Sequence, residues 1–140
     1  MAIAKRLQVG HHDVFGHGAF LVSEVSQVLD FDASTRENKV QAREKDTGLP
    51  LWQVEVLDAD PEAGKKGRTV VVKFAAKVQP IPPESTGDMP FRPGEFDGLS
   101  ALPYVETTGN NFSRIAWSLR AEDMRAPSKA GAGSASKAVA

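Results

Sequence analysis

The chain has no cysteine among its 140 residues, and it has no long apolar run. The first absence excludes disulfide bonds, a thiolate nucleophile and a zinc site with cysteine ligands, and it fits a reducing compartment. The second excludes the roughly 18 consecutive apolar residues of a membrane span and the apolar core of a signal peptide. We therefore expect a soluble, cytoplasmic protein with no membrane partner.

An excess of charge of one sign is also missing. The 17 basic and 18 acidic side chains leave a net charge of −1, so the molecule as a whole attracts a polyanion only weakly. Nine of the 17 basic residues nevertheless lie between Arg36 and Lys77. Any binding of nucleic acid must therefore come from a local arrangement of charges.

Apolar residues alternate with polar ones at a period of two, which is typical of β-strands. Strands are expected at residues 19–31, 38–45, 51–59, 68–81, 96–106 and 112–123. Five or six strands without a strongly amphipathic helix predict an all-β fold, a small OB-like (oligonucleotide-binding) barrel over residues 19–125, with a sandwich as the alternative. Residues 1–18 are predicted to form a flexible N-terminal arm, and residues 126–140 a flexible, disordered C-terminal tail.

The segment KVQAREKDTGLPLWQVEVL, residues 39–57, is predicted to form a hairpin around Gly48. If Ala42 faces Trp52, Val40 faces Val54 and the first strand has one uncharged face. Its other face then carries a basic and amide row: Lys39, Gln41, Arg43 and Lys45. A solvated edge would explain this row, and a surface for a polyanion is the more specific interpretation.

Few residues are suited to catalysis or metal binding. The only cluster of potential metal ligands is His11, His12, Asp13 and His17. Adjacent histidines on an extended chain point apart, so a mobile arm is preferred to a metal site. The stretch AGKKGRT resembles a phosphate loop, but the Walker pattern needs a glycine where Ala59 stands and a helix where a strand is expected. We expect neither an enzyme nor a cofactor.

Binding of a single nucleic-acid strand needs cations along the phosphates and aromatic rings for the bases. The candidate cations are Lys39, Arg43, Lys45, Lys65, Lys66, Arg68, Lys73 and Lys77. Trp52 and Phe91 are the candidate stacking rings. Alternation with Val54 favours a core position for Trp52, whereas no apolar periodicity includes Phe91. Trp117 alternates with Ile115 and Leu119 and is predicted to be core.

The phrases KVQAREKDTGLPLWQVEVL, RTVVVKFAAKV, FDGLSALPYVE and RIAWSLRA resemble the small OB-fold, single-strand-binding-like proteins of actinobacterial plasmids and integrative elements. The resemblance covers roughly residues 19–125. It implies a DNA-binding protein that supports replication or conjugative transfer, together with replication or transfer proteins, and we expect a homo-oligomer. The chain lacks the acidic tip of housekeeping single-strand-binding proteins, because it ends in SKAVA. The alternative is a protein-binding β-module that does not contact DNA.

Overall fold

The computed structural model describes residues 6–64, 68–84, 91–107 and 109–127. Within these ranges the chain forms one helical turn and nine strands. The elements are β1 (Leu7–Gln8), α1 (His11–Val14), β2 (Ala19–Leu21), β3 (Ser26–Gln27), β4 (Leu51–Asp58), β5 (Thr69–Ala75), β6 (Arg92–Asp97), β7 (Ser100–Thr107), β8 (Ser113–Ala121) and β9 (Asp123–Arg125). The prediction of an all-β fold is confirmed, but the five or six expected strands are replaced by nine shorter ones.

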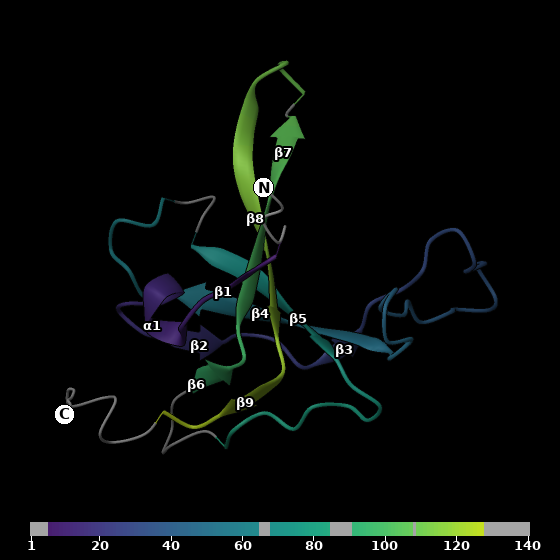
Figure 1. Cartoon of the computed structure of the whole chain (residues 1–140), viewed down its shortest axis with the longest axis horizontal. Coiled ribbons are helices and arrows are strands. Elements are labelled where there is room, and N and C mark those ends of the chain that lie inside the picture. Colours follow the sequence, from purple (N-terminus) through teal and green to yellow (C-terminus); the bar gives the residue numbers. More distant parts are fainter. Residues whose placement is uncertain (1–5, 65–67, 85–90, 108, 128–140) are drawn as a thin grey trace, which may run out of the picture.

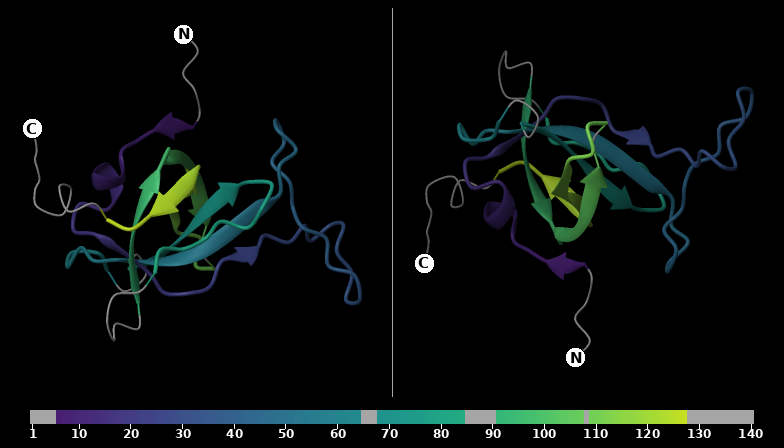
Figure 2. Two further views of the ribbon diagram at one scale, coloured as in Figure 1. Left: turned by 90° about the horizontal axis from the view of Figure 1, so that it is seen from below. Right: turned by 90° about the horizontal axis from the view of Figure 1, so that it is seen from above.

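The strands form one curled sheet in the order β1-β7-β8-β5-β4-β2-β6-β9, with β3 beside β4 (Figures 1 and 2). Neighbours are antiparallel except β5 and β8, which run parallel. Although β6 and β7 lie far apart in this order, they are consecutive in the chain and are joined by Gly98 and Leu99. The sheet therefore curls into a half-barrel. Gly98 permits the sharp turn because its φ of +62° suits glycine.

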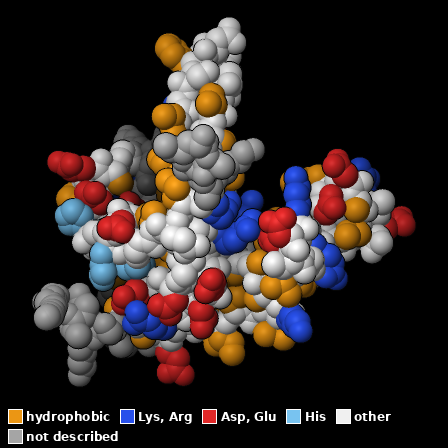
Figure 3. Space-filling view, in the orientation of Figure 1, with side chains coloured by type: hydrophobic (Ala, Val, Ile, Leu, Met, Phe, Trp, Pro, Cys, Tyr) orange, Lys and Arg blue, Asp and Glu red, His pale blue; other side chains and the backbone are white. Residues whose placement is uncertain are grey.

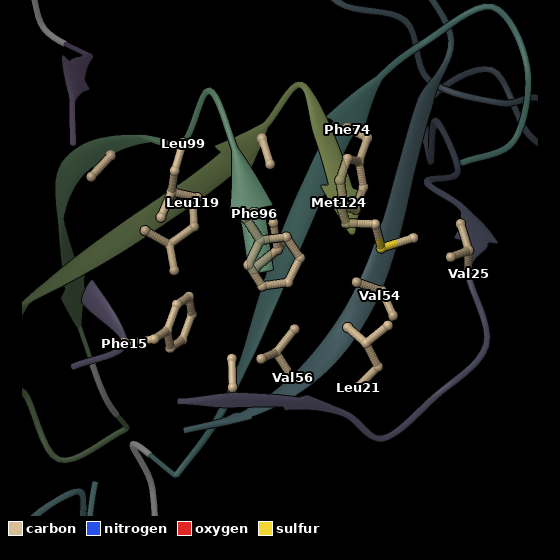
Figure 4. Packing of buried hydrophobic residues seen from close by; sticks show 14 residues of the cluster. Phe15, Leu21, Val25, Val54, Val56, Phe74, Phe96, Leu99, Leu119 and Met124 are labelled. Carbon is tan, nitrogen blue, oxygen red and sulfur yellow. The ribbon is translucent and has the colours of Figure 1, made fainter. Parts of the chain in front are cut away.

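The core lies on the inner face of this curl (Figure 4). The alternation of β4 and β5 puts Val54, Val56, Val72 and Phe74 inside, and all four are at most 1% exposed. Phe96 from β6 lies 6.1 Å from Phe74, measured between ring centroids. The predicted inward faces of these two strands are therefore correct.

The segment that precedes the first predicted strand packs on the sheet from Arg6 onward. Leu7 and Gln8 pair with Ala101 and Ser100 of β7. After the turn of α1, Phe15 is 1% exposed and lies in the core, 5.8 Å from Phe96 between ring centroids. Of the predicted tail, residues 128–140 lie outside the described residues.

The single strand predicted at residues 19–31 is interrupted. Leu21 pairs with Val56, but Ser26 pairs with Gln53, so two extra residues are accommodated between β2 and β3. At this break the Ser23 hydroxyl accepts a hydrogen bond from the Glu55 N–H, at 2.9 Å. Such a bulge bends a strand, and here it lies between β2, which pairs with both β4 and β6, and β3, which pairs with β4.

The predicted strand at residues 38–45 is wrong. Residues 28–50 instead form an excursion, which projects at the right in Figure 1 and carries only two isolated bridges, Leu29–Gln41 and Arg43–Pro50. The expected partner of Ala42, Trp52, pairs with Phe74 of β5. Apolar cross-strand pairs stabilise a sheet, and β5 offers them on its inner face whereas residues 38–45 are largely polar. The basic row on a strand face therefore does not form.

Candidate nucleic-acid interface

A groove opens where β5 and β8 separate. The two strands pair at only three positions, between Val72 and Leu119, Lys73 and Arg120, and Phe74 and Ala121. Before Leu119, β8 stays with β7 while β5 stays with β4. The β7–β8 hairpin consequently projects from the body, at the top of Figure 1, and we call residues 102–107 and 109–118 the arm. The groove lies between the arm and β5, is also lined by Val9, Asp13 and Val14 of the N-terminal segment, and has a volume of about 930 Å³.

One face of the arm is polar and continues onto the sheet. Cross-strand register places Tyr104 opposite Ala116 and Glu106 opposite Arg114. On β8 the same side carries Ser118 and Arg120, and on the adjoining strands it carries Lys73 beside Arg120 and Gln53 beside Lys73. We call this surface the polar face. Its members that line the groove are Gln53, Lys73, Tyr104, Glu106, Arg114, Ala116 and Ser118.

Two guanidinium groups meet at the base of the polar face. Arg6 donates to the Ser118 carbonyl oxygen at 3.2 Å and to the Ser118 hydroxyl at 3.3 Å. Burial, and then the positive charge of the nearby Arg120, lower the pKa of Arg6. The Arg120 Nε is buried and has no hydrogen-bond partner among the described residues. This pair is therefore a local concentration of positive charge with unused donor capacity.

A carboxylate from the excursion lies against this pair. Glu44 Oε2 is 3.7 Å from Arg120 Nη1. The Glu44 carboxylate also accepts the backbone N–H groups of Asp46 and Thr47, and these hydrogen bonds lower its pKa. The contact links the excursion to β8. Figure 3 accordingly shows Lys and Arg side chains between the base of the arm and the excursion.

The predicted cations occupy several places rather than one row. Lys39, Arg43 and Lys45 are exposed on the excursion, where Arg43 donates to the Gly48 carbonyl at 2.9 Å. Lys73 is half-buried in the groove on β5. The other described cations, Arg68 and Lys77, are exposed just before and just after β5. Lys65 and Lys66 lie outside the described residues.

The rings best placed for bases are not those expected from the sequence. Trp52 packs on the core and donates its indole N–H to the Ala76 carbonyl at 3.0 Å. Phe91 is 40% exposed next to β6, outside the groove lining. In contrast, Tyr104 and Trp117 line the groove and are 48% and 52% exposed.

The prediction that Trp117 is core is therefore wrong. Alternation does put it on the same side as the buried Leu119, but β8 continues beyond the body of the sheet. No second layer covers that side within the described residues, so Trp117 and Ile115 remain exposed. The polar face could have been predicted from the sequence, because Arg114, Ser118 and Arg120 lie at alternate positions on the same side of β8.

The histidine cluster has mainly structural contacts. His11 Nδ1 accepts the Phe96 N–H at 3.2 Å, and burial lowers the pKa of His11. His12 lies 3.8 Å from Glu95, and His17 lies 3.7 Å from Asp60. In the ranges that the structure describes, no group of three or more His, Asp or Glu side chains is arranged to hold a metal ion.

The chain was also compared with family models, with curated proteins and with solved structures, and none of the three comparisons found a match. Over the described residues, no helix has the length and apolar character needed to cross a membrane. The function has to be inferred from the groove and its surroundings.

Proposed function

We propose that the protein binds single-stranded DNA, largely independently of sequence, on the polar face. The observation that carries this proposal is the groove itself, which brings Lys73, Arg114 and the half-exposed ring of Tyr104 together. Arg6 adjoins it through its hydrogen bond to Ser118, and Arg120 through its pairing with Lys73. Cations beside an accessible ring are the two components that single-strand recognition requires.

A single strand fits this arrangement better than a duplex. Its unpaired bases can stack on Tyr104, at about 1–3 kcal/mol per base, while its phosphates meet the arginines and lysines. A duplex keeps its bases stacked internally and would engage only the cations. The exposed Lys39, Arg43 and Lys45 on the excursion would extend the phosphate path, because Glu44 connects the excursion to Arg120.

The connectivity supports an OB-like barrel as part of this proposal. β2 with β3 can be counted as one bent first strand, β4 and β5 as the second and third, β6 with β7 as a bent fourth, and β8 as the fifth. The order of these five strands in the sheet is then first, second, third, fifth, fourth. The fourth strand also pairs with the first, through β6 and β2. The excursion is then the loop between the first and second strands, and the arm ends in the loop between the fourth and fifth. OB domains bind oligonucleotides with these two loops and the face of strands two and three.

The resemblance to single-strand-binding-like proteins of mobile elements supports the cellular part of the proposal. Coating or guiding a single strand during replication or conjugative transfer would place the protein in the cytoplasm, beside replication or transfer proteins. Its near-neutral charge of −1 means that affinity depends on the local groove rather than on long-range attraction.

A protein-binding β-module without direct DNA contact is the second candidate. It is favoured by the contact between Glu44 and Arg120, because a carboxylate already lies against the arginine pair. An acidic segment of a partner protein could occupy the same place. This candidate predicts no binding to DNA at any salt concentration.

Fluorescence anisotropy of a labelled single strand of about 20 nucleotides, titrated at low and at physiological salt with duplex as competitor, tests the proposal. The affinity should fall with salt at a slope of about −0.7 per neutralised phosphate. The double variant Lys73→Glu/Arg114→Glu should lose most of the affinity. The same two-charge reversal at Lys129 and Lys137 of the tail is the matched control. Equal effects of the two variants, or no binding at low salt, would overturn the proposal.

A further inference from the structure

The groove is lined by the edges of two strands as well as by their faces. Side chains at successive positions of a strand point to opposite sides of the sheet, so a pocket over one side would be lined by alternate residues. Here β5 contributes residues 69–71 and β8 contributes residues 114–119, in both cases without interruption. The groove therefore passes between the two strands, and we call the space between residues 69–71 and residues 113–117 the gap.

Both strand edges that border the gap are open. β5 uses its other edge for β4, and it reaches β8 only from Val72 onward. β8 uses its other edge for β7, so among the described residues no strand pairs with residues 113–117 on the side of β5. The two strands diverge from the pair Val72 and Leu119 (Figure 1). An open edge presents a row of N–H and C=O groups that can pair with another strand.

These two edges lack the usual protection against strand addition. Natural edges are commonly blocked by proline, by lysine or by a covering segment. Residues 69–71 are Thr-Val-Val and residues 115–117 are Ile-Ala-Trp, so neither stretch contains a charge or a proline. Such β-branched and aromatic residues favour strands. The outer edge of β7, in contrast, contains Pro103, which lacks an N–H group. The gap is therefore the better place for an added strand.

The two sides of the gap differ in chemistry. On the outer side Lys73 lies near the closed end, and it has no ion-pair partner in the part of the chain that the structure describes. Arg114 lies further out and is already paired with Glu106 at 2.9 Å. On the inner side Ile115 and Trp117 are 69% and 52% exposed. An inserted strand would direct alternate side chains to these two sides, and it should carry an acidic one toward Lys73 and apolar ones toward Ile115 and Trp117.

We infer that the gap binds an extended peptide segment of a partner protein, which enters as an additional strand between β5 and β8. These two strands run parallel, so one inserted strand has the same sense relative to both. In such complexes main-chain hydrogen bonds supply affinity, and pockets for alternate side chains supply specificity. A nucleic acid has no row of amide donors and carbonyl acceptors at the spacing of a strand, about 3.3 Å per residue, so it cannot satisfy both edges. The inference goes beyond the proposed DNA binding and does not depend on it, although both ligands would use Lys73.

Fluorescence anisotropy of a labelled peptide, titrated with the full chain in the absence of DNA, tests the inference. The probe is a peptide of about nine residues in which threonine alternates with valine and glutamate replaces the central threonine. Successive N–H groups of a strand point in opposite directions, so methylating the valine nitrogens blocks pairing with one edge, and methylating the other nitrogens blocks pairing with the second edge. Each methylated peptide should bind at least about tenfold more weakly, because several main-chain hydrogen bonds are lost.

Three results of this titration would overturn the inference. The unmodified peptide could fail to bind. Only one of the methylated peptides could lose affinity, which would mean addition to a single edge. Neither could lose affinity, which would mean that side chains alone make the contact.

Reversal of the charge of Lys73 tests the predicted side-chain pattern. Lys73→Glu should weaken binding of the glutamate peptide about two- to fivefold, and it should strengthen binding of the same peptide with lysine in place of glutamate. Partial unfolding of the variant would weaken both peptides, so the opposite signs identify a direct contact. Lys77→Glu is the matched control, because Lys77 is exposed after β5 and lies outside the groove lining. Equal effects of the two variants would contradict the predicted pattern.

Other occupants of the gap give different results. Sedimentation velocity shows at which concentrations the chain self-associates. Peptide binding only where the chain is monomeric would mean that a second copy fills the gap, and it would overturn the inference. Binding of single-stranded DNA without binding of the peptide would also overturn it and would leave the proposed function intact. Binding of the peptide without binding of DNA would support the inference and overturn the proposed function.

Discussion

The Glu44 carboxylate lies 3.7 Å from the Arg120 guanidinium, with Arg6 nearby. Under the proposed function, a DNA phosphate would take the same position on Arg120. An internal carboxylate and an incoming phosphate would compete for the same donors. The contact is one of several links between the excursion and the sheet, because the Leu51 N–H also donates to the Ala42 carbonyl at 2.9 Å and the Gln41 side chain donates to the Leu51 carbonyl at 2.8 Å. Displacement of the carboxylate would therefore free the Glu44 side chain and leave the excursion attached.

Replacing Glu44 tests the competition. Glu44→Gln removes the negative charge, so the affinity for single-stranded DNA should rise about two- to fivefold, the range expected for losing one partly exposed ion pair. Glu37→Gln is the control, because Glu37 is exposed on the same excursion and the change in charge is identical. Anisotropy titrations at low salt measure the effect. An equal gain in both variants would attribute it to net charge alone.

Tyr104 and Trp52 should behave differently. Tyr104→Ala removes a half-exposed ring from the groove and should weaken binding to a single strand by about 1–3 kcal/mol, whereas Tyr104→Phe keeps the stacking surface and most of the affinity. Trp52→Phe should leave the affinity unchanged. It should lower the free energy of unfolding by about 1 kcal/mol, because the Ala76 carbonyl loses its indole donor. Denaturant titration and anisotropy measure the two effects. A large loss of affinity in Trp52→Phe would contradict this assignment of roles.

His11 should make stability depend on pH. Because its folded pKa is lowered, the unfolded state binds a proton first as the pH falls below the ordinary value of 6.5. The stabilising effect of a neutral His11 is therefore complete above pH 6.5 and is lost as the pH falls from there through the folded pKa. Tm should decline over this window in the wild type. His11→Gln should reduce this decline in Tm, and the control His17→Gln should retain it. If the decline persists unchanged in His11→Gln, another titratable group causes it.

Gly98 should be sensitive to substitution. A Cβ there would meet the Glu122 side chain at 2.6 Å, and the φ of +62° disfavours any residue with a Cβ. Gly98→Ala should lower the free energy of unfolding by roughly 1–2 kcal/mol. Gly64→Ala is the control, since no atom of the described residues lies within 4 Å of the added atom. Equal stabilities in denaturant titrations would show that the bend between β6 and β7 tolerates a different backbone geometry.

The sequence was informative where a local pattern decides the structure. Alternation correctly placed Val54, Val56, Val72 and Phe74 inside. It also placed Trp117 on the correct side of β8, but a period of two specifies a side and not whether another layer covers it. The arm reaches past the body, so the same pattern gives a buried Leu119 and an exposed Trp117.

Other features depend on residues far apart in the chain. The predicted pairing of residues 38–45 with β4 was wrong because the apolar partner, β5, comes later in the sequence. Arg6 reaches the polar face only because Leu7 and Gln8 pair with β7, more than 90 residues away. No spacing in the sequence indicates that contact. The cation cluster, unlike the strands that carry it, could therefore be found only from the structure.

The parallel pairing of β5 with β8 has a consequence for folding. The hairpins β4–β5 and β7–β8 each join neighbouring strands, so each can form from local contacts. The curl joins β5 to a strand that follows some 40 residues later, and β2 to β6 across about 70 residues. Closing such loops costs chain entropy before any long-range contact compensates for it, and sheets of this type fold in milliseconds to seconds. The curled sheet should therefore assemble late, from two hairpins that already exist.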